Sequence, residues 1–197
     1  MAATTFQTSA IDTLLRFFSS VTPLSPHAAA AICNCLVLEK FPRKHLLQQQ
    51  QRMATHLYIV GKGMLRSFYR HKGKEVTTAL GLENCVICAL DGLLSHEPSF
   101  YNIETLEESE IISIAFSDLE ALYNDFHEIE RLGRLMITRY YLEQEAGLRS
   151  LRFKTAEERY RELETTNPEL LQRAPLGYLA SYLGITQATL SRIRSRY

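Results

Sequence analysis

Residues 56–82 read HLYIVGKGMLRSFYRHKGKEVTTALGL, and the alternation of short β-rich runs with turn residues in this segment determines which class of fold the chain adopts. Three short runs rich in β-branched and aromatic residues are separated by two turn-like pieces, GKG and HKGK. Runs this short and this closely spaced predict strands joined by tight turns.

Similar runs lie on both sides of this segment: LVLEKF at 36–41, YNIETL at 101–106 and EIISIAF at 110–116. The β-rich region therefore extends from about Leu36 to Phe116. Many short strands at close spacing are typical of an antiparallel sandwich or jelly roll. Helical patterns flank this region, so the expected fold class is α+β: two short helices lead in, and the chain is helical after Ser117-Asp118.

A long helix is predicted over 127–151, where roughly 25 residues without proline span about 37 Å. Its apolar positions are too many for a narrow coiled-coil seam, so the helix is expected to contact both the β region and something else. Gly133, Tyr140 and Gly147 recur every seven residues, a row that favours close approach of a second copy. The predicted dimer interface comprises Ile129, Leu132, Gly133, Met136, Tyr140 and Gly147. The alternative is a helix that packs only within its own chain.

The last segment, APLGYLASYLGITQATLSRIRSRY at 174–197, predicts two helices separated by a three-residue turn. The first helix is expected over 176–183 and the second over 187–196. Ala180 is small where the helices cross, and Gly184 supplies the positive φ that such a turn requires. Before this hairpin, Thr155 and Glu158 fit a capping box, and both Ser25-Pro26 and Asn167-Pro168 offer an N-cap and a first-turn proline.

Inner and outer faces of this hairpin differ in chemistry. Five apolar side chains are expected to lock the helices in place: Leu179, Leu183, Ile185, Leu190 and Ile193. The outward face of the second helix carries small polar groups and guanidinium groups but no acid, which is the chemistry that reads a major groove. The candidate DNA-contacting residues are Thr186, which can also cap the helix, Gln187, Ala188, Thr189, Ser191, Arg192, Arg194 and Arg196.

The charge distribution points the same way. The chain has 22 basic and 22 acidic residues, but residues 1–148 carry a net charge of −4 and residues 149–197 a net charge of +4. Such clustering is the electrostatic footprint of a polyanion-binding module. Two alternatives stay open: a solvated basic face, and a ligand-binding or docking module whose terminal hairpin contacts a protein instead of DNA.

Composition limits the remaining classes. The chain is 46% hydrophobic over 197 residues, and it has neither an apolar run long enough for a spanning helix nor the basic start of a secretory signal. A cytoplasmic protein without membrane contact is expected, with four cysteines that remain thiols. The histidines are scattered singly, so neither a metal site nor an enzyme is predicted.

Several segments carry a resemblance to the Crp/Fnr-type bacterial transcription regulators over nearly the full length: HLYIVGKGMLRSFYRHKGKE, FHEIERLGRLM, AEERYREL and ASYLGITQATLSRIR. The last two resemble a branch common in Bacteroidetes. The resemblance implies a β-roll like a cyclic nucleotide-binding domain, a dimerisation helix and a winged-helix domain, with double-stranded DNA, a second copy of the chain and RNA polymerase as partners. It also implies that Gln187, Ala188 and Arg192 face bases, while Thr189 and Ser191 lie near the backbone. The short tail beyond Arg196 leaves no room for a later β-wing.

The sensory half departs from this family. Nucleotide-binding members use a Gly-Glu pair for the ribose and an arginine for the cyclic phosphate, whereas residues 85–106 read CVICALDGLLSHEPSFYNIETL. No Lys or Arg occurs between Lys74 and Arg131, and a buried phosphate without a cation is strongly disfavoured. This argues against cyclic AMP, so no cofactor is predicted. Another ligand in the roll would contact Asp91, Ser95, Tyr101 and Asn102; the alternative is a filled roll in which these side chains satisfy turns.

The cysteines suggest a metal or redox role only weakly. Cys33 and Cys35, with Cys85 and Cys88, offer four thiolates, but their spacing does not match the iron–sulfur pattern of the resembled family. Buried, inert thiols are expected instead. The predicted organisation is a sensor domain over 1–125, a dimerisation helix over 126–151 and a helix-turn-helix domain over 152–197.

Overall fold

The computed structural model describes the backbone of residues 2–196 and the side chains of residues 11–196. Eight strands form an antiparallel β-roll. They are β1 (Val37–Phe41), β2 (Leu46–Gln48), β3 (His56–Lys62), β4 (Leu65–His71), β5 (Lys74–Gly81), β6 (Val86–Cys88), β7 (Asn102–Thr105) and β8 (Ser109–Ala115). The two four-stranded sheets have the orders β1-β8-β3-β6 and β2-β7-β4-β5. The antiparallel roll predicted from the short β-rich runs is confirmed.

Turn chemistry explains how residues 56–82 fold. The hairpin between β4 and β5 pairs His71 with Lys74, and Lys72 and Gly73 have φ values of 50° and 75°. Positive φ at both central residues is the geometry whose twist matches paired strands. Gly63, between β3 and β4, has φ of 101°, and a Cβ there would lie 2.3 Å from the hydroxyl oxygen of Ser109. Only glycine fits this connection.

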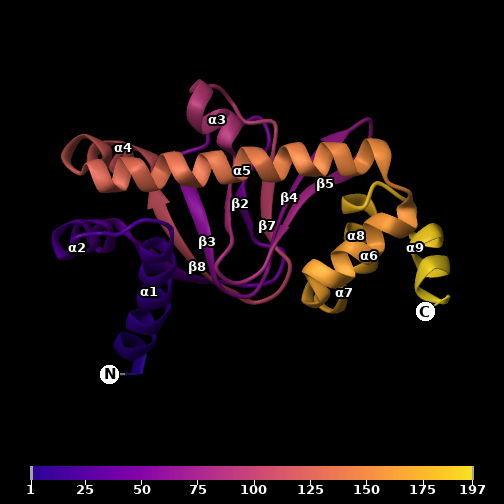
Figure 1. Cartoon of the computed structure of the whole chain (residues 1–197), viewed down its shortest axis with the longest axis horizontal. Helices are drawn as coiled ribbons and strands as arrows, with labels where there is room; N and C mark the ends of the chain where they lie inside the picture. The colour runs from indigo at the N-terminus through magenta and orange to yellow at the C-terminus, as the bar shows by residue number, and fades with distance from the viewer. Residues whose placement is uncertain (1, 197) are drawn as a thin grey trace.

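Helices flank the roll at both ends of the chain. They are α1 (Ala2–Val21), α2 (Pro26–Cys35), α3 (Leu90–Ser95), α4 (Phe116–Asp125), α5 (His127–Phe153), α6 (Ala156–Thr166), α7 (Pro168–Arg173), α8 (Leu176–Tyr182) and α9 (Gln187–Arg194). Figure 1 shows α5 running the length of the roll, with α1 and α2 near one end and α6–α9 gathered below the other. From residue 116 to residue 196 no strand occurs, so the described residues hold none of the wing strands that the resemblance implies.

The predicted helix caps fold as expected with one exception. The Ser25 hydroxyl accepts from the backbone N–H of Ala28, and Thr155 and Glu158 form a reciprocal capping box. Asn167 precedes α7, but its side chain makes no cap hydrogen bond; its amide nitrogen instead donates to the Thr166 hydroxyl. Asn167 thus holds the N-cap position with Pro168 in the first turn, as predicted, but the capping bond is missing, because Asn167 also ends α6 and its φ of −145° and ψ of 62° do not follow the usual N-cap geometry.

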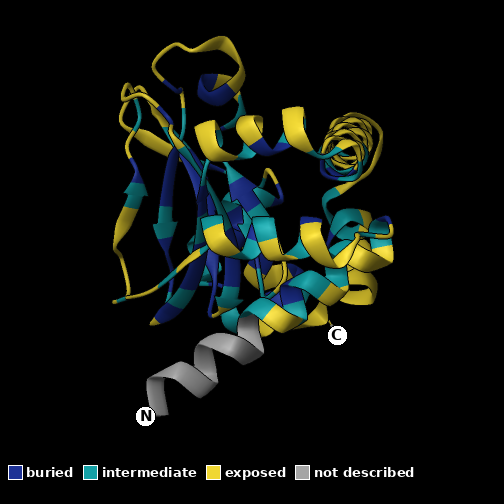
Figure 2. Cartoon of the chain, turned by 90° about the vertical axis from the view of Figure 1, so that its left-hand side faces the viewer, coloured by how far each residue is buried: buried dark blue, intermediate teal, exposed yellow. Residues whose placement is uncertain are grey.

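Burial shows that the core of the roll continues into the C-terminal helices. Figure 2 shows buried residues concentrated in the strands and exposed residues along most of α5, which is seen there nearly end-on. Met64 and Leu106 of the roll belong to the same buried cluster as Leu163 and Leu179. The predicted three-part division of the chain stays a prediction, and this cluster crosses its second boundary. Among residues 2–196, no helix combines the length and apolar character needed to cross a bilayer.

Candidate nucleic-acid interface

The hairpin of α8 and α9 has the geometry expected from its sequence. Gly184 follows α8 with φ of 66°, and the backbone N–H of Ile185 donates to the Ala180 carbonyl over 2.9 Å. Ala180 is fully buried at the crossing of the two helices. A residue with a larger side chain at that point would push the helices apart.

The predicted apolar face is also observed. Leu179, Leu183, Leu190 and Ile193 are buried, and Ile185 is half-buried against the same cluster. This face is covered by α6 and α7 through Tyr160, Leu163 and Leu170. The opposite face of α9 is therefore the one left to solvent.

The N-terminus of α9 is held by Thr186. Its hydroxyl oxygen accepts from the backbone N–H of Thr189 over 3.1 Å and lies 2.9 Å from the Thr189 hydroxyl. This confirms the predicted cap. The Thr186 hydroxyl is therefore already engaged within the helix, by both the backbone N–H and the hydroxyl of Thr189.

The outward face of α9 is polar and basic. Arg192 is exposed, and its guanidinium makes only 3.4 Å contacts with the Ala188 carbonyl and the Thr189 hydroxyl. No carboxylate among the described residues pairs with it. Gln187 is exposed but lies over α8, since a Cβ on Gly177 would come within 2.4 Å of its amide nitrogen. Exposed positions on this face are Gln187, Ala188, Ser191, Arg192, Ser195 and Arg196, while Thr189 and Arg194 are half-buried.

Two of the three arginines near the terminus already have partners in the chain. Arg194, expected to point outward, donates to the Leu171 carbonyl over 2.7 Å. Leu171 lies in the last turn of α7, where backbone carbonyls have no partner within the helix, and a guanidinium satisfies one of them. Arg196 is 71% exposed and lies 3.9 Å from Glu157, a contact weak enough for phosphate to displace.

The dimer residues predicted on the long helix fall on two different faces. Ile129 is 0% exposed and Leu132 is buried in the chain's own core, and Met136 is half-buried against them. A Cβ on Gly133 would meet the Tyr123 hydroxyl of α4 at 2.2 Å. These four residues pack within the single chain because α4 covers the first half of α5, and their place in a dimer interface stays a prediction.

The second half of α5 presents a different apolar surface, which sequence reasoning missed. Tyr140, which was predicted, is exposed, and nothing lies within 4 Å of the position of a Cβ on Gly147. The other large exposed apolar residues of α5 are Ile137, Tyr141, Leu142, Leu148, Leu151 and Phe153. Ile137, Tyr141, Leu148 and Leu151 follow the alternating spacing of three and four residues that defines a coiled-coil seam, with Gln144 between them. We call these four residues the α5 seam.

The predicted ligand residues of the roll are engaged in turns. The Asp91 carboxylate accepts from the Ser99 hydroxyl and from the backbone N–H of Phe100. Asn102 is buried, and its side-chain oxygen accepts from the Gln50 backbone N–H while its side-chain nitrogen donates to the Gln50 side-chain oxygen. Ser95 accepts from the backbone N–H of Glu97. Tyr101 packs edge-on against Tyr69 and Phe100. A ligand at these residues stays a prediction.

The cysteines lie in two separate regions, and residues 11–196 hold no group of three metal-ligating side chains that faces one point. Cys33 and Cys35 end α2, as expected for an apolar helix end. Burial raises the pKa of the Cys88 thiol to about 12, and Asp91 adds to this shift, so Cys88 stays protonated at neutral pH. Cys85 is exposed, contrary to the expectation of buried thiols.

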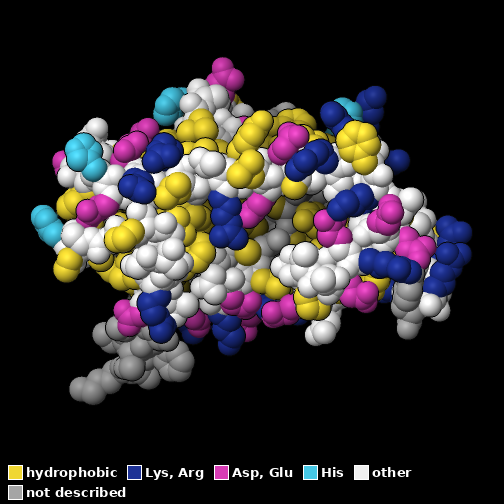
Figure 3. Space-filling model, viewed as in Figure 1, with side chains coloured by type: hydrophobic (Ala, Val, Ile, Leu, Met, Phe, Trp, Pro, Cys, Tyr) yellow, Lys and Arg dark blue, Asp and Glu magenta, His cyan; other side chains and the backbone are white. Residues whose placement is uncertain are grey.

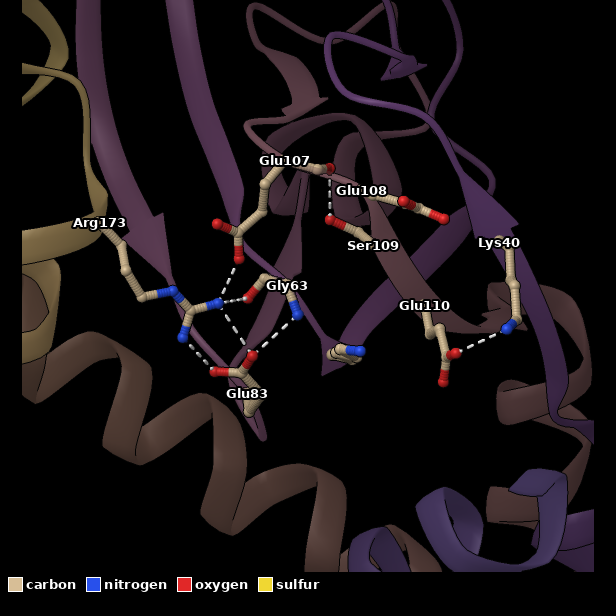
Figure 4. A pocket seen from close by; sticks show the side chains of 9 residues that line it. Lys40, Gly63, Glu83, Glu107, Glu108, Ser109, Glu110 and Arg173 are labelled. Carbon is tan, nitrogen blue, oxygen red and sulfur yellow. Dashed lines mark hydrogen bonds and ion pairs between the residues drawn. The ribbon is translucent and has the colours of Figure 1, made fainter. Parts of the chain in front are cut away.

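A charged cavity of about 400 Å³ lies where α7 meets the roll. In Figure 4, Arg173 points into it between Glu83 and Glu107. The guanidinium binds both oxygens of Glu83 at 2.9 Å and also the Gly63 carbonyl at 3.0 Å. Arg173 also pairs with Glu169, so one guanidinium holds three carboxylates in an ion-pair network that ties the C-terminal helices to the roll.

The roll is similar to a known protein family. Residues 38–126 match the family described as "Cyclic nucleotide-binding domain". This match covers β1 to α4 and leaves the C-terminal helices outside it. No curated protein sequence matches the chain.

Solved structures share the architecture over most of the chain. The catabolite activator protein of Thermus thermophilus is 21% identical, with 89% of this chain and 84% of that chain covered and a TM-score of 0.57. The c-di-GMP responsive global regulator CLP of Xanthomonas campestris is 15% identical, with 87% and 91% covered and a TM-score of 0.68. A protein from Eubacterium rectale described as a transcriptional regulator of the Crp/Fnr family is 14% identical, with 88% and 83% covered and a TM-score of 0.66. At these identities the likeness shows a common fold.

Proposed function

We propose that the chain is a transcription regulator that binds double-stranded DNA sequence-specifically as a homodimer. The observation that carries the proposal is the outward face of α9, which is exposed, free of acid and furnished with an arginine that has no ion-pair partner. Figure 3 shows basic side chains gathered at the end of the molecule that carries α9. A helix with this face, supported on its other side by α8, fits a major groove.

Each residue of the face has a role that follows from its chemistry and position. Arg192 is the candidate for bidentate hydrogen bonding to guanine, and Gln187 for adenine. Ala188 leaves room for a thymine methyl group. Thr189 and Ser191 would contact the DNA backbone, as the sequence resemblance implies, and Arg196 would bind phosphate without reading bases.

The α5 seam supports dimerisation. Four large side chains, Ile137, Tyr141, Leu148 and Leu151, lie in one row, and each is exposed in the single chain. A second copy of the same helix is a self-complementary partner for such a row, related by a two-fold axis. Pairing would place two α9 helices against an inverted repeat, one DNA turn of about 34 to 36 Å apart.

Cyclic nucleotide binding is not part of the proposal. The segment from 75 to 130 holds no Lys or Arg, and the buried Arg66 is already paired with Glu75 and Glu104. Any signal that enters the roll would act by shifting the population between two arrangements of the DNA-binding helices. RNA polymerase is the further partner that the sequence resemblance implies.

Selection of bound duplexes from a random pool, followed by fluorescence anisotropy, tests the proposal. An inverted repeat should emerge. Arg192→Ala should cost roughly 1 to 3 kcal/mol on the selected site and relax one base preference. Arg43→Ala, which removes an exposed arginine from the β1–β2 turn, is the matched control and should bind like the unchanged chain. Failure to enrich any sequence, or an equal loss on all sequences for Arg192→Ala, would contradict sequence-specific reading.

A further inference from the structure

Helix α8 has a second contact surface besides the one it shares with α9. β5 is an edge strand of its sheet, so its outer backbone groups have no neighbouring strand. The backbone N–H of Thr77 donates to the Ser181 hydroxyl over 2.9 Å, and that hydroxyl lies 3.4 Å from the Glu75 carbonyl. The serine of α8 thus takes the place of a missing strand at this edge.

A buried cation joins the same two elements. Arg66 follows Leu65, which packs in the core of the roll, and in a strand the next side chain points to the opposite face. The Arg66 side chain is 1% exposed and pairs with Glu75 at 2.8 Å and Glu104 at 2.9 Å. Its Nε also donates to the Thr77 hydroxyl over 2.9 Å.

Aromatic rings from both parts of the chain contact this cation. The guanidinium carbon lies 4.1 Å from the ring centre of Phe68 in β4 and 3.7 Å from that of Tyr178 in α8. A guanidinium that contacts two aromatic rings and pairs with two carboxylates is well satisfied when buried. Without Tyr178, Arg66 would lose one of these two ring contacts.

Helix α8 therefore connects the roll to α9, because it contacts both of them. On one side it is fixed to β4 and β5 by Tyr178 and Ser181. On the other side Leu179 and Leu183 pack with Leu190 of α9 in one buried cluster. The covalent route between the roll and these helices is longer, since it passes along α5 and the two-residue junction after Phe153.

We propose that Arg66, Tyr178 and Ser181 are positioning residues that fix the orientation of α9 against the roll and thereby set the spacing between DNA half-sites. The inference rests on the proposed DNA-binding function. If both α9 helices are held rigidly to paired rolls, the dimer accepts one half-site spacing, because each added base pair moves a half-site by about 3.4 Å and rotates it by about 34°. The Arg173 ion pairs and the shared buried cluster also hold the C-terminal helices to the roll, so losing the Tyr178 and Ser181 contacts would loosen the orientation of α9 enough for it to follow a half-site displaced by one base pair.

The test uses the full chain and duplexes that carry the selected half-sites at the native spacing and with one or two base pairs added or removed. The Tyr178→Leu/Ser181→Ala double variant keeps the apolar volume and the helix but removes the ring face and the hydroxyl. Ser20→Ala, on the remote helix α1, is the control. The unchanged chain and the control should lose about tenfold or more in affinity when the spacing changes by one base pair. The double variant should lose less than about threefold.

A second measurement tests the hydrogen bond between Thr77 and Ser181 in the absence of DNA. In the unchanged chain the Thr77 amide should exchange slowly with deuterium, and in the single variant Ser181→Ala it should exchange at least about tenfold faster, because its acceptor is gone. Equal exchange in both proteins, or a spacing profile of the double variant that matches that of the unchanged chain, would overturn the inference. If the unchanged chain binds no duplex, the proposed function itself fails and the positioning role falls with it.

Discussion

The carboxylate of Glu83 connects one residue of the roll to one residue of α7. Burial would raise the pKa of Glu83, but hydrogen bonds from Arg173 and from the backbone N–H of Gly63 outweigh this effect and lower it from 4.5 to about 2. A carboxyl whose pKa falls on folding stabilises the folded state above its unfolded pKa. That contribution is lost as the pH falls from about 5 to 2.

Glu83→Gln should therefore destabilise the chain by ~2 kcal/mol at neutral pH, a value reduced for the 32% exposure of the Glu83 side chain. The difference from the unchanged chain should shrink steadily below pH 4.5, because the unchanged chain also loses the ionised carboxylate there. Urea unfolding at pH 7, 4 and 3 measures it. Glu108→Gln, on the rim of the same cavity, is the control. A difference that stays constant with pH would show that this ion pair is not the cause.

The sequence predicted the conformation or hydrogen bonding of single residues correctly where these depend on close neighbours in the chain. The positive φ of Gly184 and the caps at Ser25, Thr155 and Thr186 each depend on neighbours within a few positions. Arg194 differs because its partner, Leu171, lies 23 residues away. Arg66 and Tyr178 are 112 positions apart, and nothing in either local sequence indicates that they stack.

At the scale of helices and strands, periodicity predicted which segments are regular but not which side is covered. The β-rich runs became strands, whereas the three-residue strands β2 and β6 and the short helix α3 are too brief to give a pattern. Along α5 the apolar positions form two stripes. The first half packs against α4 inside the chain, and only the second half is free, a distinction that depends on where α4 lies.

Charge placed in the α5 seam should separate the two copies. Leu148 is 52% exposed in the single chain, so Leu148→Glu removes little internal packing and should leave the fold intact. In a paired helix it would bury two carboxylates near the two-fold axis, at a cost of several kcal/mol. Sedimentation should show a dimer for the unchanged chain and a monomer for the variant.

Val37→Glu provides the matched control for that experiment, because Val37 is 53% exposed but lies on β1, away from α5. It should remain dimeric. A dimer of unchanged strength in Leu148→Glu would place the interface elsewhere on the molecule.

At the scale of the whole molecule, net charge is distributed unevenly between the two parts of the chain, whereas the buried core runs through both of them. The net charge of −4 over residues 1–148 and of +4 over residues 149–197 lies on a body whose buried clusters run from the roll into the terminal helices. In the proposed function, this asymmetry would attract a duplex to the α9 end of the molecule and would orient the encounter before any base is read.

Salt dependence follows from this arrangement. Each arginine that binds phosphate releases counterions, so the affinity falls with salt by an exponent close to the number of phosphates contacted. Arg196 is exposed and only loosely paired with Glu157, so Arg196→Ala should reduce the slope of log K against log salt by about 1 per protomer, or about 2 per dimer, equally on all sequences. Anisotropy titrations from 50 to 200 mM salt measure the slope. An unchanged slope would mean that α9 meets DNA at an angle that leaves Arg196 in solvent, and a sequence-dependent loss would make Arg196 a base-reading residue instead.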